Sequence, residues 1–187
     1  IDLQHGWVAA GQSIFATSDG GKNWNWVTNA PGSIRHVDFM DEQQGWLFTS
    51  DGLFRSSDSG LSWQRVALPS TIITETTSVK DIDFNSTQRG WIALKDIFLR
   101  TTDDGATWQI GSLPCTETFP PTMAHIEERS IYLIREQEAW LICGGEPAGA
   151  GSLAFKWLFY TPDDGVTWRL INAASPENIR KKGSILA

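Results

Sequence analysis

Four aspartates recur at one position of a repeated phrase, and they are the first side chains to test for chemistry. The phrase reads hydroxyl-x-Asp-x-Gly-x-x-Trp, with a further polar residue just before the tryptophan. A carboxylate held beside a pocket can act as a general acid or base. A carboxylate followed by glycine can instead close a tight turn, because glycine adopts positive φ without strain. The positions are Asp19, Gly21 and Trp24; Asp58, Gly60 and Trp63; Asp103, Gly105 and Trp108; and Asp163, Gly165 and Trp168.

Repetition favours the structural interpretation of these aspartates. A catalytic carboxylate is a singular position, whereas these are four equivalents at the tips of four separate hairpins. The tryptophan that ends each phrase is a large apolar anchor, typical of a strand that returns into a core. We therefore predict a turn-closing Asp and a packing Trp in each copy, and no catalytic residue among them.

Other residue types give weaker catalytic candidates. A glycosidase needs two carboxylates at a defined separation, and Asp38 and Asp83 occupy equivalent positions in two repeats. The alternative is that both bind neighbouring backbone or line a wet channel, and we favour it. His5, His36 and His125 have no recurring Ser or Cys partner, so a catalytic triad has no support. No metal-ligand or phosphate-loop spacing occurs, and we expect neither metal nor cofactor.

Composition excludes several classes of partner. The chain has 187 residues and a net charge of −7, which argues against nucleic acid because phosphate binding needs a basic face. No apolar run approaches the ~20 residues of a membrane span. The first residue is Ile1 rather than methionine, so a removed leader stays compatible with the sequence. The two cysteines, Cys115 and Cys143, permit a disulfide, a buried pair or neither.

Two further repeated features place the phrase in a larger unit. A small residue and a tryptophan lie upstream of each copy, and 12 residues separate this Trp from the Asp in the first three copies. Alternating apolar segments such as Val37–Phe39 lie before that Trp, which is the period-2 pattern of strands. In the second copy we expect strands at 34–39, 45–49, 52–56 and 62–66. Four strands in about 40–45 residues are typical of a β-propeller blade.

The predicted fold is therefore all-β, a single propeller domain over residues 1–187 with four-stranded antiparallel blades. The blades span about 1–30, 31–68, 79–112 and 130–172, and the first lacks its first strand. Residues 183–187 resemble the start of a first strand and could complete the first blade. Alternatively, the chain is a segment of a longer ring, or two chains share one ring as a homo-oligomer, because four blades are few for a closed propeller.

The phrase resembles the Asp-box, or BNR repeat, of sialidases, sortilin-type receptors and xyloglucan hydrolases. The combination of Asp-x-Phe, Gly-Trp and Thr-x-Asp-Gly-Gly-x-x-Trp is most similar to the Ycf48-like photosystem II assembly and stability factors and their relatives in non-photosynthetic bacteria. The resemblance covers residues 1 to about 171. It implies a propeller that binds proteins outside the cytoplasm, periplasmic or secreted. The basic client-binding surface of the photosynthetic members has no matching arginine cluster in this sequence.

Loop length predicts where a partner would bind. The Asp-box turns have fixed length, whereas length varies in the loops at the opposite face of the blades, and such loops carry recognition when a scaffold positions them. This face would present an apolar tip with a charged rim, which suits a protein partner. A disulfide between Cys115 and Cys143 would border it. The candidate residues are Glu117, Phe119, Pro120, His125, Glu128, Arg129 and Glu146.

Two functions follow as hypotheses. The first is a non-catalytic, exported propeller scaffold for protein interaction or assembly. The second is a carbohydrate-binding or glycoside hydrolase propeller, sialidase- or xyloglucanase-like, with Asp38 and Asp83 near its site. We expect the first, with a protein partner, neither nucleic acid nor membrane insertion, and a glycan as the alternative ligand.

Overall fold

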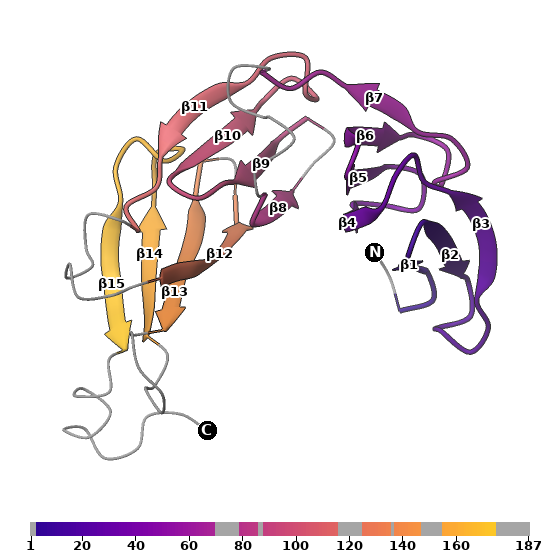
Figure 1. Cartoon of the computed structure of the whole chain (residues 1–187), viewed down its shortest axis with the longest axis horizontal. Coiled ribbons are helices and arrows are strands. Elements are labelled where there is room, and N and C mark those ends of the chain that lie inside the picture. The colour runs from indigo at the N-terminus through magenta and orange to yellow at the C-terminus, as the bar shows by residue number, and fades with distance from the viewer. Residues whose placement is uncertain are drawn as a thin grey trace. The chain divides into compact units, whose positions relative to one another are not determined.

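The computed structural model describes residues 3–69, 79–85, 88–115, 125–135, 137–146 and 155–174, and within these ranges it contains β-strands and no helix (Figure 1). The chain divides into two compact units. The first unit comprises Ile1–Thr77, Phe84–Gly90 and Thr101–Trp108. The second comprises Ser78–Asp83, Trp91–Arg100 and Gln109–Ala187.

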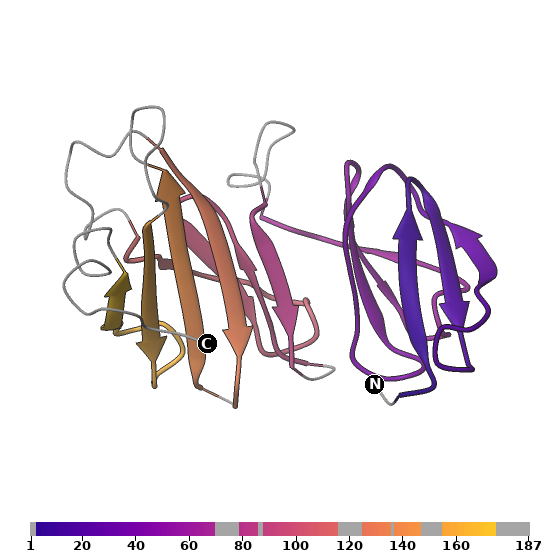
Figure 2. The same ribbon diagram turned by 90° about the horizontal axis from the view of Figure 1, so that it is seen from below.

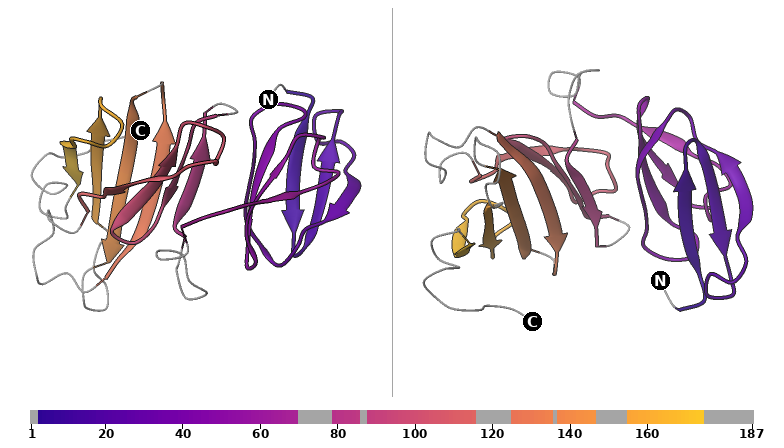
Figure 3. Two further views of the ribbon diagram at one scale, coloured as in Figure 1. Left: turned by 90° about the horizontal axis from the view of Figure 1, so that it is seen from above. Right: turned by 60° about the horizontal axis from the view of Figure 1, so that its bottom comes forward.

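The strands form four antiparallel sheets, each ordered along the chain. The first sheet has three strands and the second has four, and the two lie together in the first unit (Figure 3). Their strands are β1 (Gly6–Ala10), β2 (Ser13–Thr17) and β3 (Asn25–Asn29), followed by β4 (Ile34–Phe39), β5 (Gly45–Thr49), β6 (Gly52–Ser56) and β7 (Gln64–Val66).

The third and fourth sheets have four strands each, and β12 and β13 are the longest of the described strands (Figure 2). The third sheet contains β8 (Asp81–Phe84), β9 (Gly90–Ala93), β10 (Ile97–Thr101) and β11 (Gln109–Ser112). The fourth contains β12 (His125–Leu133), β13 (Ala139–Glu146), β14 (Phe155–Thr161) and β15 (Arg169–Ala174).

The observed strands agree closely with the repeat pattern. The strands β4, β5 and β6 have the predicted bounds, and β7 begins two residues later than expected, at Gln64. Within the described residues the first sheet has three strands, β1, β2 and β3. The fourth sheet is longer than its predicted range because β12 begins at His125 and β15 ends at Ala174. The predicted strand at 183–187 lies outside the described residues.

In the second and third sheets the glycine before the upstream tryptophan is explained by the strand beside it. Gly45 pairs with Phe39 in the register of β4 and β5, and a Cβ at Gly45 would lie 2.6 Å from the Phe39 ring. In the fourth sheet the corresponding pair is Leu133 with Ala139, so the smaller partner leaves room for a methyl group. The aromatic ring thus dictates glycine at this position.

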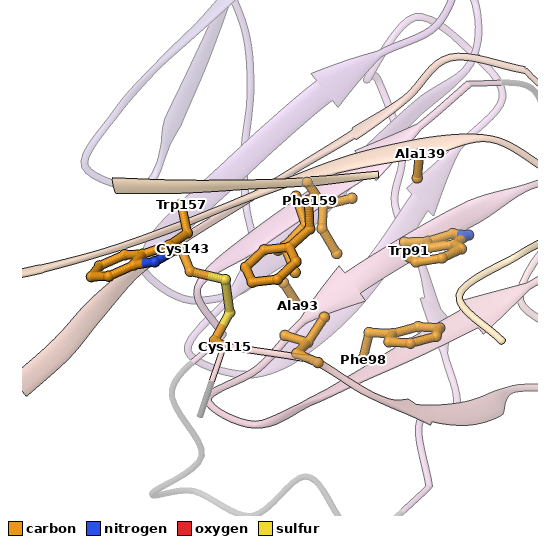
Figure 4. Close-up of a cluster of buried hydrophobic side chains, with 11 residues drawn as sticks. Trp91, Ala93, Phe98, Cys115, Ala139, Cys143, Trp157 and Phe159 are labelled. Carbon is orange, nitrogen blue, oxygen red and sulfur yellow. A yellow bond between two sulfur atoms is a disulfide. The ribbon is translucent and has the colours of Figure 1, made fainter. Parts of the chain in front are cut away.

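Each unit has its own apolar core. In the first unit Ile14, Leu47 and Phe54 are buried between the two sheets. In the second unit the buried cluster contains Trp91, Phe98 and Phe159, with the rings of Trp91 and Phe98 stacked at 4.3 Å (Figure 4). A disulfide joins Cys115 to Cys143 at the edge of this cluster, and neither cysteine is exposed. The disulfide hypothesis therefore holds in this structure.

Candidate functional site

The four Asp-box turns have nearly identical hydrogen bonds. In the third copy the Thr101 hydroxyl donates to Asp103 Oδ1 at 2.8 Å and accepts the Gly105 N–H at 2.8 Å. Asp103 Oδ1 accepts the Thr107 N–H at 2.8 Å, and Oδ2 accepts the Thr107 hydroxyl at 2.6 Å. Glycine is required because φ at Gly105 is 79°. The first hydroxyl residue of the motif, to which the sequence analysis assigned no role, thus binds the N–H two residues after Asp.

These hydrogen bonds stabilise the ionised form of each motif aspartate. The Asn23 N–H, the Asn23 amide and the Thr17 hydroxyl lower the pKa of Asp19 to about 2. The equivalent hydroxyl and backbone groups also lower the pKa of Asp58, Asp103 and Asp163. A general acid must hold a proton near neutral pH, and these carboxylates are tuned in the opposite direction. Their geometry is that of turn supports.

A second aspartate in two of the turns forms an ion pair with a strand of the preceding repeat. Asp104 pairs with Arg55 of β6, within the first unit. Asp164 pairs with Arg100 of β10 at 3.2 Å, within the second unit. Burial raises the pKa of Asp104, although the Arg55 guanidinium acts to lower it. The adjacent acids of the motif are therefore used to join repeats.

Carboxylates on the first strand of the third sheet also bind backbone. Asp81 Oδ2 accepts the Ile131 N–H at 2.9 Å, and Asp83 Oδ2 accepts the Leu133 N–H at 2.5 Å. Asp83 was one member of the candidate glycosidase pair, and its position matches the alternative in which it binds neighbouring backbone. Asp38 lies on β4 opposite Trp46, in the first unit.

Most of the predicted binding face lies where the structure describes no side chain. Glu117, Phe119 and Pro120 lie outside the described residues. His125, Glu128 and Glu146 lie on β12 and β13, but their side chains are not described. Arg129, expected on a charged rim, is only 2% exposed, and its Nε donates to the Lys95 carbonyl at 2.8 Å. Burial lowers the Arg129 pKa, against the field of Asp96.

A cavity that the sequence analysis missed lies along β11 in the second unit. Its volume is about 500 Å³, and six consecutive residues, Gln109–Pro114, form one wall. Phe98 and the Asp-box turn around Val166 form the rest. Arg100 also reaches it, but its guanidinium donates to Gln109 Oε1 at 3.0 and 2.7 Å and to the Asp164 carbonyl at 2.5 Å. One feature of the sequence could have indicated this cavity: the third repeat has the small residue Gly111 where the second repeat has Val66.

Two searches of the described residues were negative. No group of three His, Cys, Asp or Glu side chains that could hold a metal ion occurs in the ranges that the structure describes. No helix long and apolar enough to cross a membrane occurs in those ranges either.

Repeated antiparallel meanders of three or four strands, each with an Asp-box turn between its last two strands, define an Asp-box β-propeller. A family model described as photosynthesis system II assembly factor YCF48 matches residues 28–134. This match covers more than half of the sequence, and the chain belongs to that family.

Comparison with solved structures shows the same fold. The structure titled "YCF48 bound to D1 peptide" has 16% sequence identity and a TM-score of 0.50, and the match covers 91% of this chain and 79% of that chain. A GH74 enzyme from Niastella koreensis has 12% identity and a TM-score of 0.52, with coverage of 84% of this chain and 34% of the enzyme. None of the curated proteins matches this chain. The all-β propeller class predicted from the repeats is thereby confirmed.

Proposed function

We propose that this chain is a non-catalytic propeller scaffold that binds a protein partner. The observation that carries the proposal is the structural use of its motif carboxylates. Each Asp-box aspartate is hydrogen-bonded within its own turn, and Asp83 accepts a backbone N–H. These carboxylates stabilise turns and join strands, as expected of a scaffold.

Membership of an assembly-factor family supports a protein as the partner. The YCF48 structure of the comparison is bound to a peptide, and by analogy we propose that a protein segment binds this chain. The proposal includes the binding face predicted from the sequence. This face consists of the loops that contain Glu117, Phe119 and Pro120, together with the ends of β12 and β13. Single-domain organisation over residues 1–187 is likewise proposed.

We also propose an extracytoplasmic location. The buried disulfide between Cys115 and Cys143 supports it, because disulfides persist in oxidising compartments and are rare in the cytosol. The competing function is glycoside hydrolysis, which the GH74 fold relative brings into consideration.

The two functions are separated by one set of assays. The chain is tested on a panel of fluorogenic glycosides and a glycan array, with Asp83→Asn beside it. We expect no turnover and no glycan retention. Turnover that is abolished by Asp83→Asn would overturn the scaffold proposal. In parallel, crosslinking in cells followed by reconstitution with the purified, identified protein should give a direct complex, and its failure would count against a protein partner.

A further inference from the structure

Sheets that follow one another along the chain pack in one repeated way within each unit. The upstream tryptophan of a repeat and the residue after it lie on opposite faces of the sheet. We call the face with the tryptophan the leading face and the other the trailing face. In the first unit Ile14, on the leading face of the first sheet, packs with Leu47, on the trailing face of the second. In the second unit Phe98 and Phe159 make the equivalent contact between the third and fourth sheets (Figure 4).

The leading face of the fourth sheet carries an exposed aromatic row. The strand register places Tyr132, Trp140 and Tyr160 opposite one another, and the rings of Trp140 and Tyr160 lie 5.1 Å apart. Tyr132 is 52% exposed. Leu158 on the same face is half-buried, whereas Ile14, at the equivalent position of the first sheet, is 0% exposed. The fourth sheet thus exposes apolar surface at positions that the first sheet buries.

The trailing face of the first sheet is also exposed and apolar. The register places Val8, Phe15 and Trp26 in one row, and Val8 and Trp26 are 43% and 59% exposed. At the first two of these positions the second sheet has Leu47 and Phe54, which are 0% and 7% exposed. Contiguous exposed apolar surface of this kind marks an interaction site. The first sheet thus presents the half of the contact that the fourth sheet lacks.

The glycine of the Asp-box shows where a leading-face tryptophan belongs. In the third turn the ring of Trp46, from the preceding sheet, lies 3.2 Å from the position of a Cβ at Gly105. In the first turn the three atoms nearest to a Cβ at Gly21 all belong to Trp24 of the same turn, the closest at 3.7 Å. The first turn therefore has the shape of the others without a tryptophan from a preceding sheet.

Size and charge match between these two faces. In the third turn Asp104 pairs with Arg55 of the preceding sheet, and the fourth turn repeats this ion pair. Tyr160 occupies the position of Arg55 in the fourth sheet, and Gly20 occupies the position of Asp104 in the first turn. A large uncharged side chain in one face thus corresponds to a residue with neither side chain nor charge in the other.

We propose that the leading face of the fourth sheet binds the trailing face of the first sheet in a second copy of this chain. Trp140 packs over Gly21 of the second copy, and Tyr160 packs against Gly20. The contact is heterologous, so two copies related by a two-fold axis make it twice. It uses surfaces other than the predicted loop face, and the inference therefore goes beyond the proposed function and is tested separately.

The first test exchanges one kind of pair for the other in the full chain. Analytical ultracentrifugation at micromolar concentration should give the mass of two chains. Tyr160→Arg places a cation opposite an uncharged glycine and should weaken association at least tenfold, a difference of about 1.4 kcal/mol. Tyr160→Arg with Gly20→Asp recreates the pair of Arg55 and Asp104 and should restore association. Aspartate suits this site because φ is 72° at Gly20 and 63° at Asp104.

The second test mixes two variants that are each blocked on one face. Tyr132→Lys places a charge on the fourth sheet, and Trp26→Lys places one on the first; both positions are exposed, so the fold should persist. Each variant alone should sediment as a single chain. An equimolar mixture should recover a two-chain complex, because one intact face of each kind remains. Leu61→Lys, at a turn position that is 65% exposed, is the matched control and should associate normally.

Each outcome decides the proposal. A single-chain mass at every concentration overturns it, because the two faces then meet within one chain or bind something else. Association that survives both Tyr132→Lys and Trp26→Lys overturns it as well, since another surface must then carry the contact. Loss in the single variants, with recovery in the mixture and in the Arg–Asp double variant, establishes the heterologous contact.

Discussion

At the scale of single residues, the first hydroxyl of each Asp-box is as important as the aspartate. Thr101 is 2% exposed, and its hydroxyl holds both the Asp103 carboxylate and the Gly105 N–H. Thr101→Val keeps the shape and leaves that buried N–H without an acceptor, so we expect a loss of about 1–3 kcal/mol in the free energy of unfolding. Urea denaturation measures it.

A matched control separates the hydroxyl from its methyl group. Thr101→Ser keeps the hydroxyl, and Ser56 performs the same function in the second copy with 2.8 and 2.9 Å bonds. We expect Thr101→Ser to retain most of the stability. A stability loss found in Thr101→Ser but not in Thr101→Val would show that packing of the methyl group, rather than the hydrogen bonds, matters at this position.

The motif aspartates also predict acid sensitivity. Hydrogen bonds lower the pKa of Asp19 from 3.8 to about 2, and they lower the pKa of Asp58, Asp103 and Asp163 as well. A carboxyl with a lowered pKa in the folded state stabilises the fold above its unfolded pKa and loses this contribution as the pH falls through its folded pKa. Stability should therefore decrease from about pH 4 toward pH 2.

Thermal unfolding followed by circular dichroism across this range tests the prediction. Asp19→Asn should flatten part of the decline, because the variant has no carboxyl to protonate at that turn. Burial raises the pKa of Asp104, so protonation of this residue at low pH favours the folded state. Thermal stability that increases toward pH 2 would therefore contradict a dominant contribution of the motif aspartates.

At the scale of elements, strands and turns were predictable because their signals are local and repeated. The bounds of β4, β5 and β6 follow from alternation and from the Gly-Trp and Asp-box landmarks, which bracket each strand. The cavity along β11 was not predictable. It depends on how Phe98 and Gly111 pack together across two strands, and one glycine in a strand does not show which ring covers it.

Replacing the Phe98–Gly111 pair of the third sheet by the Leu53–Val66 pair of the second sheet tests this packing. Gly111→Val should clash with the Phe98 ring and cost about 1–3 kcal/mol in the free energy of unfolding. The double variant Phe98→Leu with Gly111→Val recreates the Leu53 and Val66 arrangement of the second sheet, so its loss should be smaller than the sum of the single losses. A double-mutant cycle by chemical denaturation measures the coupling, and additive losses would refute the proposed equivalence.

At the scale of the whole molecule, propeller architecture and family could be predicted from four copies of one motif, because each copy specifies a blade. The binding face could not be settled in this way. Arg129 belongs to a loop-rich region by sequence, yet it is buried against the Lys95 carbonyl. Burial of a long polar side chain depends on contacts between distant segments, and a single sequence does not reveal them.

The disulfide gives the second unit a constraint that the first lacks in the described structure. Cys115 and Cys143 are separated by 28 residues in the sequence. Closing a loop of this length lowers the conformational entropy of the unfolded chain, which stabilises the fold by about 3.5 kcal/mol at room temperature. We expect Cys115→Ala with Cys143→Ala to weaken the second unit by roughly this amount. Hydrogen exchange measures this loss locally: amides of β13 and β14 should exchange faster, while those of β5 and β6 keep their rates.

Equal acceleration in both units would mean that the whole chain unfolds as one cooperative body, and unchanged rates under reducing conditions would mean that the disulfide adds no stability.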